Sequence, residues 1–192
     1  MDAKQITVLG ALVAVLLVLA FVFFWSGGEE KIRRSPDEPL QKGDDLSEGS
    51  LPTKSITLYF LSKDDNYLHS EKREIVDSPS LVRQAIQSIE ELLKGSQQGR
   101  LSPVPEGTEL REFFITKQGV AYVDFSGEIR DEHLSGTSAE LGTVFAVVNT
   151  LTYNFKSIKK VFILIDGSEK DTLAGHIDLS QPLLPRYDLV SN

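Results

Sequence analysis

The segment from Thr137 to Leu183 restricts the possible folds of this chain more than any other. Thr137 and Glu140 have the spacing of a capping box, in which two side chains satisfy free N–H groups where a helix begins. Apolar residues then recur at helical spacing: Leu141, Val144, Phe145, Val148 and Leu151. The segment therefore predicts a helix with one apolar stripe along its length.

A short strand is expected directly after this helix. Residues 161–165 read VFILI, and a run that is apolar at every position indicates a strand covered on both faces. Asp166 and Gly167 predict a turn at the end of the strand. A helix with a buried face followed by the most apolar strand of the chain predicts the centre of the core.

Strands and one further helix are expected before this centre. Four segments have strand patterns, the last two joined as a hairpin across residues 117–119: 56–60, 67–76, 109–116 and 120–125. Ser78 as N-cap, Pro79 at the first helical position and Gly95 at the end predict a helix between the second and third strands. The order ββαββαβ predicts an α+β domain, with a mostly antiparallel or mixed sheet and the two main helices packed on one face.

The chain is acidic and contains no cysteine. It has 28 Asp and Glu residues against 20 Lys and Arg, for a net charge of −8. Such a chain repels nucleic acid and anionic lipid surfaces at long range, so we expect no nucleic-acid partner. The lack of cysteine excludes disulfides, thiol catalysis, thiolate metal sites and lipid attachment through a cysteine.

Residues 1–25 predict a transmembrane anchor. The run Ile6–Trp25 contains no charge, and twenty helical residues span about 30 Å, the thickness of the hydrocarbon core. The aromatic residues at its end suit the membrane interface. A cleaved signal peptide, with the small residues 26–28 at the cleavage site, is the alternative, but the run is longer than the usual apolar region of such a peptide.

The segment that follows the apolar run is different in composition. Residues 26–54 are rich in charge, Gly, Pro and Ser, which predicts a flexible linker before a folded domain at 55–192. Lys31, Arg33 and Arg34 follow the run, whereas Lys4 precedes it. By the positive-inside rule this distribution favours a cytoplasmic C-terminus.

Four segments of the expected domain together resemble the GerMN domain: LSPVPEGTEL (101–110), GVAYVDFSGEI (119–129), ELGTVFAVVNTLT (140–152) and VFILIDGSEKDTLAGHIDLSQPL (161–183). This domain is found, usually in two copies, in GerM sporulation and germination proteins, and singly in many bacterial envelope proteins. The resemblance covers the chain from about Ser55 onward. This chain has one copy, and an expected transmembrane helix in place of a lipobox cysteine.

The resemblance implies an extracytoplasmic, non-enzymatic α+β module linked to spore-envelope or peptidoglycan-associated assemblies. This location conflicts with the charge distribution around the apolar run, and we give the resemblance more weight. We therefore expect a single-pass protein of the cytoplasmic membrane whose C-terminal domain lies outside the cytoplasm. The expected partner is an envelope protein or a peptidoglycan component.

Five polar residues are candidates for contact with a ligand or partner: Asp124, Ser126, Glu128, His176 and Asp178. If residues 173–179 are extended, His176 and Asp178 share one side, and Gly175 permits positive φ or a close backbone approach. These side chains could line a polar groove for a glycan or a peptide. In the alternative, structural interpretation, Asp178 accepts backbone N–H groups and His176 fills a gap beside the sheet.

A carboxylate cluster raises an enzymatic alternative, a cell-wall glycoside hydrolase: Asp124, Glu128, Asp131, Glu132 and Glu140, with Asp178 beyond. Such an enzyme needs one carboxyl of raised pKa as acid and one as nucleophile or base. In the competing structural interpretation, Glu140 caps its helix and Asp131 and Glu132 are solvated. The three histidines have no ligand spacing, so neither a metal nor a cofactor is predicted. The favoured prediction is a binding or scaffolding module.

Overall fold

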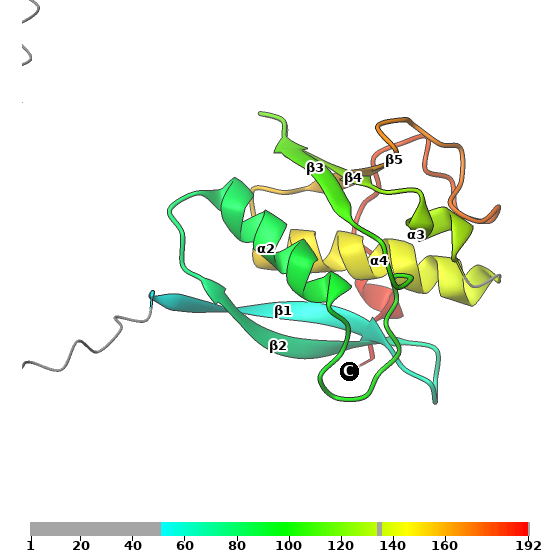
Figure 1. Cartoon of the computed structure of the whole chain (residues 1–192), viewed down its shortest axis with the longest axis horizontal. Helices are drawn as coiled ribbons and strands as arrows, with labels where there is room; N and C mark the ends of the chain where they lie inside the picture. The colour runs from blue at the N-terminus through cyan, green and yellow to red at the C-terminus, as the bar shows by residue number, and fades with distance from the viewer. Residues whose placement is uncertain (1–50, 134–135, 192) are drawn as a thin grey trace, which may run out of the picture. The chain divides into compact units, whose positions relative to one another are not determined.

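The computed structural model of the protein describes residues 51–133 and 136–191, which belong to one compact unit, Glu48–Asn192 (Figure 1). The chain has the predicted ββαββαβ order, with a one-turn helix α3 added before the long helix. The elements are β1 (Thr53–Leu61), β2 (Leu68–Val76), α2 (Leu81–Leu93), β3 (Leu110–Ile115), β4 (Val120–Phe125), α3 (Glu128–Asp131), α4 (Thr137–Asn154), β5 (Lys160–Ile165) and the short 3-10 helix η1 (Tyr187–Leu189).

The strands form two sheets. β1 and β2 pair as an antiparallel hairpin, and the second sheet has the order β3-β4-β5. The second sheet is mixed, because β3 pairs antiparallel to β4 whereas β5 pairs parallel to it. The α+β class and the mixed sheet are thus confirmed.

Helices α2 and α4 lie between the two sheets (Figure 1). Helix α4 contacts β1 on one side and β5 on the other, and α2 contacts β1, β2 and β3. The expectation of one sheet with both helices on a single face is therefore wrong. The physical reason is that both sheets have an apolar face, and a helix placed between them buries both faces at once.

Helix α4 is buried around its whole circumference. Every residue from Gly142 to Thr152 is buried, including four polar ones, so the single apolar stripe predicted for this helix understates its burial. Gly142 permits a close approach to β1, because a Cβ there would lie 3.2 Å from Leu61 Cδ1. Strand β5 is the apolar partner that the sequence predicts, with Val161, Ile163 and Ile165 buried in the core.

Both predicted helix starts need correction. Ser80, two residues after the predicted Ser78, is the N-cap of α2, and its hydroxyl accepts the Arg83 N–H at 3.3 Å. Helix α4 begins after Gly136 with no side-chain cap. The Thr137–Glu140 capping box is therefore wrong, because the Glu140 side chain points into the protein and bonds elsewhere.

In the part of the chain that the structure describes, no helix has the length and apolar character needed to cross a membrane. The predicted anchor Ile6–Trp25 and nearly all of the predicted linker 26–54 lie outside the described residues. Both assignments, and the domain boundary at Ser55, stay predictions.

Candidate functional site

The side chain of Glu140 closes the loop at residues 173–177. Glu140 lies in the first turn of α4 and its side chain is 0% exposed. Its Oε1 accepts the backbone N–H groups of Ala174 and Ile177 at 2.9 and 3.1 Å, and its Oε2 accepts the N–H of His176 at 2.9 Å. One carboxylate therefore satisfies three loop amides.

The ring of His176 completes this arrangement. Its Nδ1 lies 2.9 Å from Glu140 Oε2, and because an ionised carboxylate can only accept, this nitrogen carries the proton. Burial acts to raise the pKa of Glu140, but the N–H groups of Ala174, Ile177 and His176, with the His176 ring, outweigh burial and lower it. Glu140 is therefore an anion that organises the loop, which also suits its place near a helix N-terminus.

Two asparagines of α4 hold other segments in the same way. Asn149 accepts the N–H of Arg186 at 2.9 Å and donates to its carbonyl at 3.0 Å. Asn154 does the same for Thr57 on the outer edge of β1, at 2.9 and 2.7 Å. Together with Glu140, these side chains explain why a largely buried helix carries polar residues: each one satisfies the backbone of a segment far away in sequence.

Asp124 supports the turn that follows β5. Its side chain is 7% exposed, its Oδ1 accepts the N–H of Gly167 at 2.8 Å, and its Oδ2 lies 3.3 Å from Arg111 Nε. Arg111 also pairs with Asp166, at 2.7 Å. Asp166 and Gly167 have φ values of 52° and 70°, as a type I′ turn requires, so the predicted turn is confirmed. The backbone of Gly127 packs closely against the Asp166 side chain. A Cβ at Gly127 would lie 2.8 Å from Asp166 Oδ2, so a larger residue there would force a shift.

Ser126 and Glu128 lie beside this turn, in the short segment between β4 and α4. The Ser126 hydroxyl oxygen accepts the N–H of Glu109 at 2.9 Å. The carboxylate of Glu128 accepts hydrogen bonds from the Ser126 side chain and from the backbone N–H of Glu128 itself. These bonds hold the pKa of Glu128 below its usual value. Asp124, Ser126 and Glu128 therefore lie in one region of the surface, as their positions at the end of β4 predict.

His176 and Asp178 lie in the loop that Glu140 organises. Gly175 has φ of 99° and a Cβ added there would meet no atom within 4 Å, so of the two alternatives for this glycine the structure shows the positive φ. Asp178 accepts the N–H and the hydroxyl of Ser180 at 2.9 and 2.6 Å, and these two bonds lower its pKa. Within the described residues, no hydrogen bond or ion pair joins these two residues to Asp124, Ser126 or Glu128. The five candidates thus divide into two groups, and their contact with a ligand stays a prediction.

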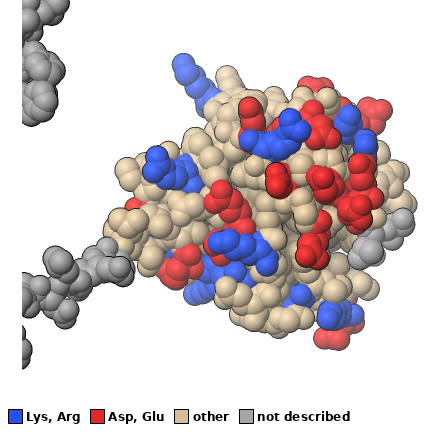
Figure 2. Space-filling view, in the orientation of Figure 1, with Lys and Arg blue, Asp and Glu red and all other residues tan. Residues whose placement is uncertain are grey.

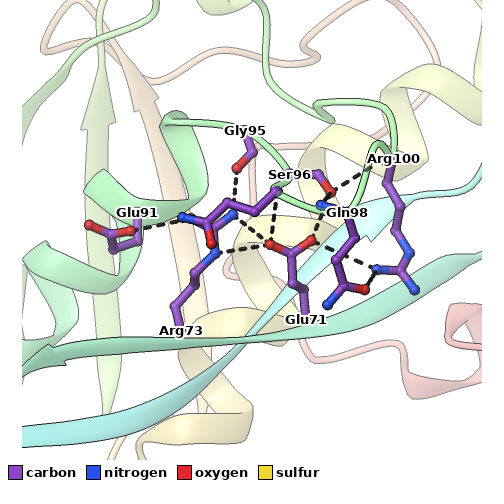
Figure 3. Close-up of polar contacts among 8 residues, drawn as sticks. Glu71, Arg73, Glu91, Gly95, Ser96, Gln98 and Arg100 are labelled. Carbon is purple, nitrogen blue, oxygen red and sulfur yellow. Dashed lines mark hydrogen bonds and ion pairs between the residues drawn. The ribbon is translucent and has the colours of Figure 1, made fainter.

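A buried charge network joins β2 to the loop after α2, and the sequence interpretation did not identify it (Figure 3). Glu71 and Arg73 form an ion pair with side chains 1% and 4% exposed. Burial acts to raise the pKa of Glu71, but hydrogen bonds from the Gln97 N–H, Ser96 and Arg73 outweigh it and lower the pKa. Arg73 in turn donates to the Gly95 carbonyl at 2.8 Å. The signal in the sequence was two opposite charges, Glu71 and Arg73, on the strand face that also carries Ile75.

The described residues include no group of three or more His, Asp or Glu side chains placed to hold a metal ion. The polar clusters instead hold backbone: Glu140 the 173–177 loop, Asp124 the turn after β5, and Glu71 the connection between α2 and β3.

The comparisons with known proteins identify the family. The family model Germane, described as sporulation and spore germination, matches residues 57–171, more than half of the chain. The chain therefore belongs to this family. Among solved structures, the first GerMN domain of the sporulation protein GerM from Bacillus subtilis is similar, with 28% identity and a TM-score of 0.56 over 70% of this chain and 99% of that one. The predicted GerMN resemblance is confirmed.

Two further structures are similar. The tandem GerMN domains of the same protein match with 28% identity and a TM-score of 0.57 over 71% of this chain and 48% of theirs, so this chain spans about half of the tandem. A putative lipoprotein from Clostridium perfringens matches with 30% identity and a TM-score of 0.49 over 74% of this chain and 91% of that one. No curated protein matches the chain significantly.

Proposed function

We propose that this protein is a non-catalytic binding module of the bacterial cell envelope that acts in sporulation or germination. In this proposal, the helix expected at Ile6–Trp25 anchors it in the cytoplasmic membrane and its folded domain lies outside the cytoplasm. Its partner is an envelope protein or a peptidoglycan component. The family to which the chain belongs supports the role in sporulation or germination, and the long uncharged run supports the anchor.

The burial of Glu140 is the observation that carries the non-catalytic part of the proposal. A glycoside hydrolase needs a carboxyl group that stays protonated near neutral pH, and therefore has a raised pKa. Glu140 is fully buried, its pKa is lowered, and both oxygens are occupied by the 173–177 loop. It has neither the proton nor the access that an acid catalyst requires.

The other carboxylates of the cluster support the same conclusion. Hydrogen bonds lower the pKa of both Glu128 and Asp178, which is the opposite of what an acid catalyst needs. Asp124 uses its two oxygens on Gly167 and Arg111, and Asp131 pairs with Arg130 at 3.2 Å. These contacts are those of a scaffold that keeps loops in place, so the geometry favours binding over hydrolysis.

The proposed function predicts contact with envelope components in intact cells. A photo-crosslinking amino acid placed separately at three half-exposed aromatic positions, Tyr67, Phe114 and Tyr153, samples three parts of the surface. We expect at least one position to crosslink an envelope protein or peptidoglycan. If all three positions yield only the uncrosslinked chain, the binding proposal fails.

Protease treatment tests the proposed location. Protease added to spheroplasts should remove the folded domain while the N-terminal segment stays in the membrane fraction. A chain that remains intact until the membrane is permeabilised would place the domain in the cytoplasm, as the charges of Lys31, Arg33 and Arg34 favour.

A further inference from the structure

Three aromatic side chains form a continuous row across the β3-β4-β5 sheet. The strand register places Phe114 beside Tyr122, and Tyr122 beside Phe162. The rings of Phe114 and Tyr122 stack with centroids 4.5 Å apart and planes 8° from parallel, and the rings of Tyr122 and Phe162 follow at 5.2 Å. The neighbouring residues Val123 and Ile163 face the core, so by strand alternation the aromatic row lies on the outward face of the sheet.

The exposure of this row increases toward β3. Phe162 on β5 is 5% exposed, whereas Phe114 on the edge strand β3 is 47% exposed. Tyr122 covers one face of the Phe114 ring, and the other face is directed away from the row. Stacking on Tyr122 holds the ring in place, so Phe114 presents a fixed apolar surface to solvent.

A hollow of about 350 Å³ opens beside Phe114. It is lined by Arg111, Glu112, Phe114, Asp124, Leu164 and Gly167. Its size falls within the range of about 300–1,000 Å³ that is common for small-molecule sites. Phe114 and Leu164 provide apolar wall, and the charged side chains provide the rest.

The polar wall contains a fixed donor and a free acceptor. Arg111 pairs with Asp124 and Asp166 through two of its nitrogens, and a guanidinium has five N–H donors, so further donors remain on a side chain that is 47% exposed. Glu112 is exposed, and the described part of the chain provides it with no hydrogen bond or ion pair. The hollow thus combines an aromatic surface, N–H donors and carboxylate acceptors.

We propose that this hollow, which we call the Phe114 hollow, binds a neutral sugar unit of a cell-envelope glycan; this inference rests on the proposed function and specifies its ligand. A sugar ring has an apolar C–H face that fits against a phenyl ring. Each of its hydroxyls can donate one hydrogen bond and accept others, so it can use both the Arg111 donors and the Glu112 acceptor. The residues that line the Phe114 hollow do not include His176 or Asp178, the two candidates in the loop that Glu140 organises.

Charge argues against an anionic or a basic ligand. Figure 2 shows acidic side chains gathered around α3 and the segment after β5, where the exposed residues are Glu128, Asp131, Glu132, Asp166, Glu169 and Asp171. This field and Glu112 repel anions. A basic peptide would have to place its cation beside the positively charged Arg111, which is already paired with Asp124 and Asp166. A neutral sugar meets neither obstacle.

Titration of the full chain with the β-1,4-linked trimer of N-acetylglucosamine tests the proposal. We expect a Kd of about 1 mM or tighter by calorimetry. In NMR spectra of the same sample, we expect the ring signals of Phe114 and Tyr122 to shift. Phe114→Ala should weaken binding about tenfold because it removes the stacking surface. Glu112→Gln, which breaks no contact within the described fold, should weaken it about threefold because the acceptor loses its charge.

The chain offers a matched control. Tyr153 on α4 is also 47% exposed but lies away from the hollow, so Tyr153→Ala should leave the Kd unchanged. Thermal unfolding of each variant shows whether the fold is kept, and Glu112→Gln keeps the test valid if Phe114→Ala proves unstable.

Three outcomes would overturn the proposal: no binding of the trimer, binding that Phe114→Ala and Glu112→Gln leave unchanged, or preferential binding of a lysine-rich peptide at Phe114. Crosslinks to an envelope protein in intact cells would leave the proposed function standing in each of these cases. Conversely, trimer binding in solution without any crosslink in cells would support the Phe114 hollow and count against the proposed function.

Discussion

The carboxylate of Glu140 receives both the backbone N–H and the ring Nδ1 of His176 on one oxygen, each at 2.9 Å. The two residues are 36 positions apart, and this contact fixes the 173–177 loop to the first turn of α4. The loop reaches solvent, since the His176 side chain is 44% exposed. The Glu140 side chain that holds the loop is 0% exposed. A buried anion thus determines the conformation of an exposed segment.

Neutralising this anchor should destabilise the domain. Glu140→Gln should lower the free energy of unfolding by about 3 kcal/mol, because an amide accepts more weakly than a carboxylate and turns a donor toward the loop amides. Glu132→Gln, on an exposed residue, should change it by less than about 0.5 kcal/mol. Urea denaturation measures both variants, and equal midpoints for Glu140→Gln and the unchanged chain would refute the anchor role.

The same residue predicts how stability depends on pH. Burial opposes ionisation of Glu140, but the loop amides and His176 outweigh it, so the pKa of Glu140 in the folded state lies below its ordinary value. A group with a lowered folded pKa stabilises the fold above its unfolded pKa, and this stabilisation is lost as the pH falls through the folded pKa. The difference in stability between the unchanged chain and Glu140→Gln should therefore be constant near neutral pH and shrink below about pH 4.5. Denaturation curves at several pH values would show a constant difference if the interpretation is wrong.

The helix-strand core predicted from the sequence can be tested by truncation. Phe145 on α4 and Ile163 on β5 are 5% and 2% exposed. Replacing either with alanine should cost about 2–5 kcal/mol, because each substitution leaves a cavity between α4 and the sheet. Val82→Ala, at a partly exposed position of α2, is the matched control and should cost less. Chemical denaturation would contradict the core assignment if the three variants unfolded at the same midpoint.

The carboxylates of Asp124 and Glu128 should be dispensable for any breakdown of cell wall. The soluble fragments released from purified peptidoglycan should stay at background with the unchanged chain, and Asp124→Asn and Glu128→Gln should not alter that level. A hydrolase would instead lose turnover by about a hundredfold or more when its acid or nucleophile is neutralised. Release that depends on either residue would establish the enzymatic alternative.

Local patterns in the sequence determined most of the secondary structure. The alternation in 56–60, the hairpin at residues 117–119, the apolar run 161–165 and the Asp166-Gly167 turn depend on residues close together in the chain, and each appears where it was predicted. The family resemblance also depends on contiguous motifs, which is why it could be identified before the fold was known.

The tertiary structure alone decided which strands share a sheet and what the buried polar residues do. A capping box at Thr137 and Glu140 was the natural local interpretation, because spacing describes only neighbours in sequence. Glu140 bonds instead to amides 34 to 37 positions away, and its partners could be known only once the chain had folded. The aromatic row of Phe114, Tyr122 and Phe162 has the same origin. These rings contact one another because of the register in which β3, β4 and β5 pair, and the sequence alone does not give that register.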